Sequence, residues 1–202
     1  MLAIFGRWLF EAVMTDTPGM EAGTAIACST LCKIFLRQEP EEFLQVHLAS
    51  FYVCLSKILV KPINDKVIVA ALRSTKKIFS FELKGSYVLV PYYFVAFSTT
   101  WSSNMLDPSV RSAVIDIIGT LICLGDHFKD VTIPLKQYPS IQYSSIGEFP
   151  VIKTFGAGRP HLMKLLVSAL AKEETTKNIE RILWCIPPFM LSFSNEEFVT
   201  HH

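Results

Sequence analysis

Apolar residues recur at steps of three and four along several stretches of the chain, which is the periodicity of an α-helix. The segment 107–124 also begins with Asp-Pro, which favours a helix start because the aspartate can cap the first turn and proline needs no donor there. These patterns predict an all-α fold. The stripes are Leu44, Leu48, Phe51, Leu55 and Ile58 in one segment, Val110, Val114, Ile117, Ile118 and Leu121 in the next, and Leu162, Leu165, Leu166, Ala169 and Leu170 after Pro160.

The expected helix starts are regularly spaced. Glu21, Asn64 and Asp107 follow one another at intervals of 43 residues, and the tripeptide KIF occurs near the end of the first helix in two units, at 33–35 and 77–79. A period of about 40–47 residues with two or three helices per unit is typical of HEAT and armadillo arrays. The sequence therefore predicts a HEAT/armadillo-like helical repeat, an α-solenoid, in which the paired helices are residues 21–37 with 41–60 and 64–81 with 84–102.

The most apolar stretch runs from Tyr87 to Phe97, where all 11 side chains are apolar or aromatic. A helix needs about 20 such residues to span a bilayer, so we expect no membrane span here. A helix that is apolar on all sides is expected to be covered by its neighbours, and Pro91 would either start its regular part or bend it. A β-strand stays open as an alternative, because valine and tyrosine favour strands and occur here as Val88, Val90, Tyr92, Tyr93 and Val95.

Proline and glycine divide the rest of the chain. Residues 126–158 contain three prolines, three glycines and no helical stripe, so they are predicted to form an irregular loop or insertion, either mobile or able to bind a ligand. The expected organisation is stacked helix pairs over 1–125, this loop, a further helical pair over 159–193 that Pro187 and Pro188 end, and a tail over 194–202.

Composition narrows the functional classes. Half of the residues are hydrophobic and 18% are charged, with a mean hydropathy of +0.37. This balance argues against disorder and fits faces covered by lipid or by more protein, or equally a fragment of something longer. The net charge is +1 without any block of like charge, so a nucleic-acid partner is not expected.

The five cysteines indicate buried free thiols rather than disulfides or metal ligands, because their number is odd and each lies in an apolar run. A reducing, cytoplasmic location follows as an expectation. Cys28 and Cys32 lie one helical turn apart, but a structural zinc site would need a second pair. No metal and no cofactor is predicted. The residues considered were Cys28, Cys32, Cys54, Cys123, Cys185, His47, His127, His161, His201 and His202.

No catalytic constellation emerges either. The glycine-rich segment 156–161 precedes a helix, as anion sites do, but it lacks the Lys-Ser/Thr ending of a P-loop and is read as a loop-to-helix junction. The carboxylates fall at expected helix starts or in turns expected to be solvated, so no catalytic residue is predicted. They are Glu41, Glu42, Asp65 and Asp107 at the starts, and Glu173, Glu174, Glu196 and Glu197 in the turns.

A rival interpretation is a helical enzyme or ligand-binding domain. Its site would lie where the loop 126–158 covers an aromatic cluster consisting of Tyr87, Tyr92, Tyr93 and Trp101. A generic helical-repeat adaptor that binds some other protein is a further alternative.

Three stretches together resemble a known family: IFGRWLFEAVM at 4–14, EAGTAIACSTLCKIFLRQEPEEFLQVHLASFY at 21–52, and FELKGSYVLVPYYFVAF at 81–97. They are similar to the beta, non-catalytic subunit of the Ral GTPase-activating protein, and less closely to its alpha subunit. RSAVIDIIGTL at 111–121 follows in the same order, whereas TDTPGM at 15–20 is a shorter linker than the family pattern has.

The resemblance implies a cytoplasmic regulatory scaffold that binds the catalytic alpha subunit as a heterodimer. Through that subunit it would support GTP hydrolysis by Ral-type small GTPases. The motifs concern packing, so no catalytic residue is carried over from the family.

Overall fold

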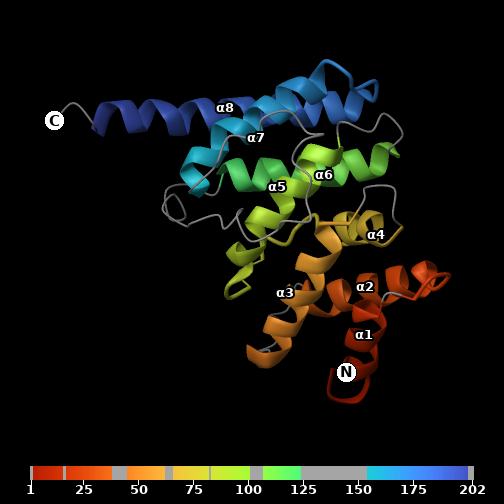
Figure 1. Ribbon diagram of the computed structural model, residues 1–202. Coiled ribbons are helices and arrows are strands. Elements are labelled where there is room, and N and C mark those ends of the chain that lie inside the picture. Colours follow the sequence, from red (N-terminus) through yellow and green to blue (C-terminus); the bar gives the residue numbers. More distant parts are fainter. Residues whose placement is uncertain are drawn as a thin grey trace. The chain divides into compact units, whose positions relative to one another are not determined.

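A computed structural model describes residues 2–15, 17–37, 45–61, 66–81, 83–100, 107–123 and 154–199 of the chain (Figure 1). The all-α prediction is confirmed, since these residues form helices and no strand. The chain divides into two compact units, Met1–Leu106 and Asp107–His202. The helices are α1 (Leu2–Met14), α2 (Glu21–Phe35), α3 (Gln45–Leu59), α4 (Lys66–Ser74), the 3₁₀ helix η1 (Ser86–Leu89), α5 (Val90–Thr100), α6 (Pro108–Cys123), α7 (Phe155–Leu170) and α8 (Thr176–Val199).

Helix α2 lies at the centre of the first unit. Its most extensive contact is with α4, and it also packs against α1. Both helices bury small side chains, Ala27 and Cys28 on α2 and Ala71 on α4. A hydrogen bond of 3.2 Å from the Ser74 hydroxyl to the Ser29 hydroxyl adds a polar link between them.

The expected pairing of α2 mainly with the helix that follows it is wrong. Helix α3 instead contacts α1, α4, η1 and α5, and it meets α2 through the stacked rings of Phe35 and Phe51, whose centroids are 4.3 Å apart. The Ser29–Ser74 hydrogen bond joins α2 to α4, whereas Phe35 at the end of α2 stacks on α3, so α2 divides its contacts between the two helices.

The apolar stretch is helical, so the β-strand alternative is wrong for its described residues. Gly85 takes a left-handed conformation with φ of +80° and leads into η1. Pro91 is the second residue of α5, where its missing N–H removes no helical bond, so it starts the regular helix. Burial begins at Leu89 and includes Tyr93, Phe94 and Phe97, whereas Tyr87 and Val88 are exposed.

None of the helices in the described part of the chain is both long enough and apolar enough to cross a lipid bilayer.

The second unit consists of α6, α7 and α8, each of which contacts the other two. The Asp107 cap is confirmed, because the Ser109 amide donates to its carboxylate at 2.7 Å, and Pro108 is the first residue of α6. A turn at residues 171–175 reverses the chain between α7 and α8 (Figure 1). The buried residues of this core include Val114, Ile117, Ile118, Leu121, Leu162, Leu166, Ala169 and Ile182.

Two proline positions differ from the predictions. Helix α7 begins at Phe155, so Pro160 lies inside it and residues 155–158 are helical rather than loop. Helix α8 continues through Pro187 and Pro188 to Val199. A proline inside a helix removes one backbone bond to the residue four positions earlier. In α8 the residues four positions before the two prolines are Leu183 and Trp184, which are both exposed. Water can therefore donate to their backbone carbonyls in place of the missing amides.

Gly119 lies where α6 meets α8. A Cβ atom at this position would be 2.8 Å from Cys185 Sγ, which is closer than packed atoms tolerate. Gly119→Ala is therefore expected to lower the free energy of unfolding by about 1–2 kcal/mol, although alanine favours helices by about 1 kcal/mol over glycine. Urea unfolding followed by circular dichroism measures the effect.

Two further variants control this prediction. Gly119→Ala combined with Cys185→Ala removes the clashing sulfur and should regain the lost stability. Gly23→Ala in α2, where no atom lies within 4 Å of the new Cβ, should be neutral or stabilising. An equal loss of unfolding free energy in Gly119→Ala and in the double variant would show that the contact with Cys185 does not cause the destabilisation.

Candidate interaction surfaces and buried polar sites

Helix α1 exposes three large apolar side chains on one side of the first unit. Ile4 and Trp8, one turn apart, are 70% and 66% exposed, and Phe5 beside them is exposed as well. The rings of Phe5 and Trp8 lie against each other with centroids 6.1 Å apart. We call Ile4, Phe5 and Trp8 the α1 surface. An exposed apolar group of this kind typically marks a protein contact.

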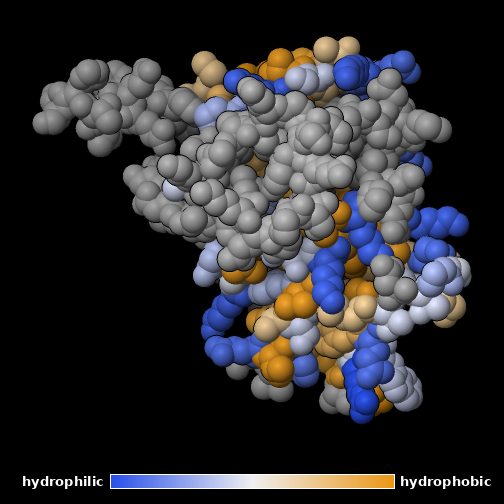
Figure 2. Space-filling view, viewed as in Figure 1, coloured by the Kyte–Doolittle hydropathy of each residue, from blue (hydrophilic) through white to orange (hydrophobic). Residues whose placement is uncertain are grey.

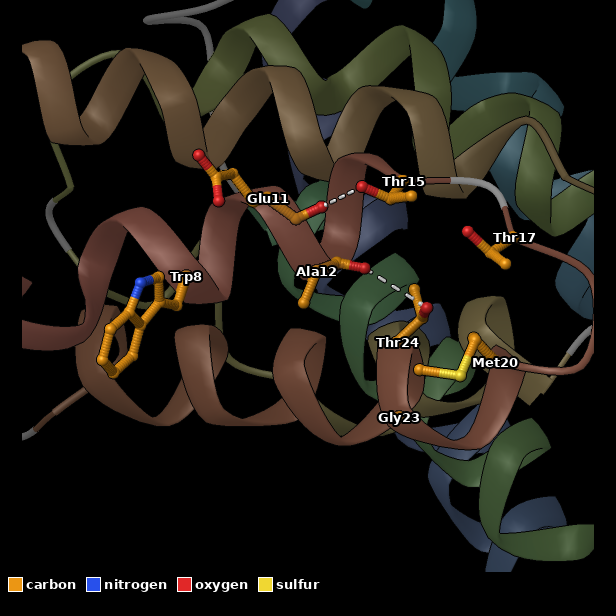
Figure 3. A pocket seen from close by; sticks show the side chains of 8 residues that line it. All are labelled: Trp8, Glu11, Ala12, Thr15, Thr17, Met20, Gly23 and Thr24. Carbon is orange, nitrogen blue, oxygen red and sulfur yellow. Dashed lines mark hydrogen bonds between the residues drawn. The ribbon is translucent and has the colours of Figure 1, made fainter.

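A pocket of about 400 Å³ adjoins the α1 surface between α1 and α2 (Figure 3). Trp8 lies at one end and Met20 at the other, and both are exposed. Small residues leave room between them. The lining residues are Trp8, Glu11, Ala12, Thr15, Thr17, Met20, Gly23 and Thr24.

Two threonine hydroxyls of this pocket are engaged with the backbone of α1. The Thr24 hydroxyl donates to the carbonyl of Ala12 at 3.3 Å, and the Thr15 hydroxyl donates to the carbonyl of Glu11 at 2.7 Å (Figure 3). Because each hydroxyl has one proton, both oxygens act toward a guest only as acceptors. The pocket can thus seat an apolar side chain between Trp8 and Met20 and accept hydrogen bonds from its polar end.

Helix α8 carries the largest exposed apolar face of the second unit. Trp184 and Leu191 are 78% and 68% exposed, and Leu183 and Met190 are exposed beside them. Figure 2 shows hydrophobic atoms at the surface of this helix. We call these residues, together with the exposed Pro187 between them, the α8 outer face.

The strongest polar constellation in the second unit joins Arg111 of α6 to Glu173 in the turn before α8. Arg111 donates from Nε and Nη2 to the two carboxylate oxygens at 2.8 and 2.9 Å, a bidentate pair. The Thr175 amide donates to the same carboxylate at 3.0 Å, and Asn178 donates to it at 3.3 Å. The prediction that Glu173 is solvated is wrong, since its side chain is fully buried.

The environment of Glu173 also changes its acidity. Burial alone would raise the pKa of the carboxyl group, but the hydrogen bonds from Arg111, Thr175 and Asn178 outweigh burial and lower the pKa to about 2. The hydrogen bond to Glu173 likewise raises the pKa of Arg111. Both groups therefore stay charged at neutral pH, and because neighbours satisfy the pair, it holds the helices together.

Two more arginines connect the helices of this unit. Arg159 on α7 is buried and donates to the carbonyl of Ile122 at 3.1 Å. This places a positive charge at the C-terminal end of α6, where the helix dipole favours it. Arg181 on α8 binds Asp116 and Ser112 on α6. The segment 156–161 belongs to the first part of α7 rather than to a loop, and Gly158 and Arg159 within it are buried.

The cysteines are free, as predicted, but not all are buried. Cys28, Cys32 and Cys54 are buried, Cys185 is half-buried, and Cys123 at the end of α6 is exposed. A hydrogen bond with Cys28 and burial raise the pKa of Cys32, and burial raises the pKa of Cys54 to about 11. Within the described ranges, no group of three or more His, Cys, Asp or Glu side chains could hold a metal ion.

The described aromatic residues of the rival ligand site differ in exposure. Tyr93 is buried in the core and donates from its hydroxyl to Thr75 Oγ1 at 2.6 Å, and burial raises its pKa. Tyr92 is half-buried and Tyr87 is exposed. Trp101 and residues 126–153 lie outside the described residues, as do Glu41, Glu42, Asp65, His127, His201 and His202.

The remaining candidate residues differ in burial. His47 is half-buried on α3, and burial lowers the pKa of the half-buried His161 on α7. Glu174 is exposed, as expected, and Glu196 and Glu197 are in the last turn of α8 rather than in a tail.

These features define a class of protein: an all-α segment whose exposed apolar faces suit protein contacts. A Rap-GAP domain-containing protein of Dictyostelium discoideum is 31% identical to it over 215 aligned residues, which cover 97% of this chain and 13% of the relative. The human Ral GTPase-activating protein subunit beta is 32% identical over 178 residues, covering 81% of this chain and 12% of that subunit. The mouse subunit beta is 29% identical over 174 residues.

The chain is therefore related by sequence to Ral GTPase-activating protein beta subunits, which confirms the resemblance predicted from its motifs. It spans about an eighth of the length of these relatives. Comparison with models of known protein families finds no match, and no solved structure matches the chain.

Proposed function

We propose that this chain is a non-catalytic scaffold segment of a Ral GTPase-activating protein complex. It binds the catalytic alpha subunit in the cytoplasm and thereby supports GTP hydrolysis by Ral-type small GTPases. The observation that carries the proposal is the relation to Ral GTPase-activating protein beta subunits over 81% of the chain. The segment itself supplies no catalytic group in this proposal.

A HEAT/armadillo-like arrangement of the first unit is part of the proposal. Helices α2 and α4 belong to consecutive units of the 43-residue sequence spacing and pack against each other. Helices α3 and α5, the second helices of the same units, are also in contact. Successive units of a solenoid stack with the first helix of one unit against the first helix of the next, and likewise for the second helices. This packing supports the architecture, although the ring contact of α2 with α3 within one unit is between Phe35 and Phe51.

We assign the contact with the alpha subunit to the α1 surface and the adjoining pocket. Ile4, Phe5 and Trp8 offer exposed apolar area, and tryptophan is the residue most often found at the energetic centre of an interface. A partner side chain that enters beside Trp8 would be desolvated on three sides by α1, α2 and Met20. The scaffold would act indirectly, by holding its partner in place.

A pull-down tests this function. The immobilised chain should retain the alpha subunit but not a Ral-type GTPase offered alone. Trp8→Glu should weaken retention about tenfold or more, since a charge in a desolvated contact is costly. Val46→Glu is the matched control, because Val46 is an equally exposed apolar residue on α3, and it should bind as the parent chain does.

The alternatives give different outcomes. Retention of neither partner by a folded chain would contradict the proposal and leave a generic helical adaptor. Saturable thermal stabilisation by a small molecule, lost in Trp8→Glu, would favour the ligand-binding alternative and place its site in the pocket of Figure 3.

A further inference from the structure

The short connection between α1 and α2 contains the chain's one Thr-Pro or Ser-Pro dipeptide, Thr17-Pro18. Proline-directed protein kinases select a threonine or serine that is followed by proline, because proline has no backbone N–H that would stay unpaired in their substrate groove. A dipeptide this short also occurs by chance, so its place in the structure decides what it can do.

Thr17 begins an exposed turn. Its carbonyl accepts a hydrogen bond from the Met20 amide at 3.1 Å, and Gly19 has a φ of +85°, as expected for a turn with proline and then glycine at its centre. All four residues of the turn, 17–20, are exposed. Because the closing hydrogen bond lies at the surface, the turn can open locally at little cost and enter a kinase groove in an extended form.

The Thr17 hydroxyl is available for modification. Thr15 and Thr24, the other threonines that line the pocket between α1 and α2, donate their hydroxyl protons to backbone carbonyls of α1. The Thr17 hydroxyl makes no hydrogen bond to another described residue, and Figure 3 shows its oxygen turned toward the other lining residues. Of the three hydroxyls, that of Thr17 can therefore lose its proton without breaking a bond to the described part of the chain.

A phosphate group on Thr17 would change the charge of this pocket. The pocket already contains the carboxylate of Glu11, which binds Arg7 Nε at 2.9 Å. A phosphothreonine adds about two negative charges at neutral pH, between the apolar ends that Trp8 and Met20 form. A partner side chain that enters the pocket would then have to displace water from the phosphate, which is costly where no further cation pairs with it.

We propose that Thr17 is a phosphorylation site for a proline-directed kinase, and that its phosphate closes the pocket to a partner side chain. In the transfer, Thr17 Oγ1 forms a bond to the γ-phosphorus of ATP, the bond from that phosphorus to the ADP oxygen breaks, and the hydroxyl proton passes to the catalytic base of the kinase. The effect on binding rests on the proposed contact of the α1 surface with the alpha subunit, whereas the modification site does not.

Phosphorylation of the full 202-residue chain tests the site. A mitogen-activated protein kinase with ATP and Mg²⁺ should transfer one phosphate, which mass spectrometry of the peptides should place on Thr17. Thr17→Ala should abolish the transfer. Pro18→Ala keeps the acceptor hydroxyl and should slow the transfer at least about tenfold, because the alanine amide would stay unpaired in the kinase groove. Thr15→Ala is the matched control, since Thr15 is exposed in the same connection without a following proline, and it should be phosphorylated like the parent chain.

Retention by the alpha subunit tests the effect of the phosphate. The phosphorylated chain should bind the immobilised alpha subunit about tenfold more weakly than the unmodified chain, and phosphatase treatment should restore binding. Val46→Glu adds a negative charge at an exposed position of α3, outside the lining of this pocket, and should bind like the unmodified chain.

Three outcomes would overturn the inference. They are a chain that receives no phosphate on Thr17, a transfer rate that Pro18→Ala leaves unchanged, and a phosphorylated chain that the alpha subunit retains as well as the unmodified one. An unmodified chain that is not retained would instead contradict the proposed function, and the release of the partner would fail with it. The kinase experiment then still decides the modification site, since it needs no alpha subunit.

Discussion

Glu173→Gln is expected to lower the free energy of unfolding at pH 7 by about 3–5 kcal/mol. The substitution keeps the shape of the side chain but removes the charge that compensates Arg111 in a buried bidentate pair. An arginine left without its counter-charge in a buried site is strongly destabilising, more than loss of one neutral hydrogen bond. Urea unfolding of the parent chain and the variant, followed by circular dichroism, measures the difference.

The pH dependence of the same measurement identifies the charge as the cause. The pKa of Glu173 is about 2 in the folded chain, against an ordinary value of 4.5, so its carboxylate binds a proton more weakly in the folded state than in the unfolded state. Its stabilising contribution is complete above about pH 5 and is lost as the pH falls toward 2, a change of about 3 kcal/mol at 1.36 kcal/mol per pKa unit. Glu173→Gln should lack this part of the acid dependence.

Glu174→Gln is the matched control, because the carboxylate of Glu174, next to Glu173 in the sequence, is exposed. Exposed ion pairs contribute little to stability. Replacing both partners, with Arg111→Met and Glu173→Leu, should restore much of the stability that the single change removes. A single variant as stable as the parent chain at pH 7 would show that the pair is not needed for folding.

Phe51→Ala is the second change with a large expected effect, about 3–5 kcal/mol of lost unfolding free energy. Phe51 is 1% exposed and stacks on Phe35 with an interplanar angle of 13°. Truncation removes the buried ring and leaves a cavity where α2 meets α3. Because Phe51 belongs to α3, amide exchange in α3 should accelerate more than exchange in α4.

Val53→Ala, on an exposed position of the same helix, controls for helix propensity and should change stability by less than about 0.5 kcal/mol. Phe51→Leu should be intermediate, as it keeps part of the buried volume. Unchanged exchange of the α3 amides in Phe51→Ala would mean that other contacts hold α3 in place.

Local patterns predicted the helices well, since they depend on residues close in sequence. The stripe after Pro108 and the Asp107 cap are both found in α6, and the helical interpretation of the run around Pro91 was correct. The partners of each helix were less predictable. The contact of α2 with α4 involves side chains far apart in the sequence, such as Ser29 and Ser74, which are 45 residues apart, and a single sequence does not state which positions face each other.

The polar sites were missed for a related reason. Glu173 lies among charged and polar residues, a context that normally indicates a solvated turn, and its partner Arg111 is 62 residues away. The spacing of Leu183, Trp184, Met190 and Leu191 is present in the sequence, but hydrophobic spacing does not tell an inner stripe from an outer one. In α8 one apolar stripe is packed and another is exposed, and the helix continues through Pro187 and Pro188, where the proline rule predicts its end.

The graded burial of the five thiols determines where an oxidant first meets this chain. Peroxide attacks thiolates that it can reach, and Cys28, Cys32 and Cys54 are enclosed by the core of the first unit. Cys185 is half-buried, and burial raises its pKa to about 11, so few of its sulfurs are ionised at neutral pH. Burial also raises the pKa of Cys123, but its sulfur is the exposed one, so we expect oxidation to begin there, at the end of α6, and to spare the sulfurs in the core of the first unit until that unit opens.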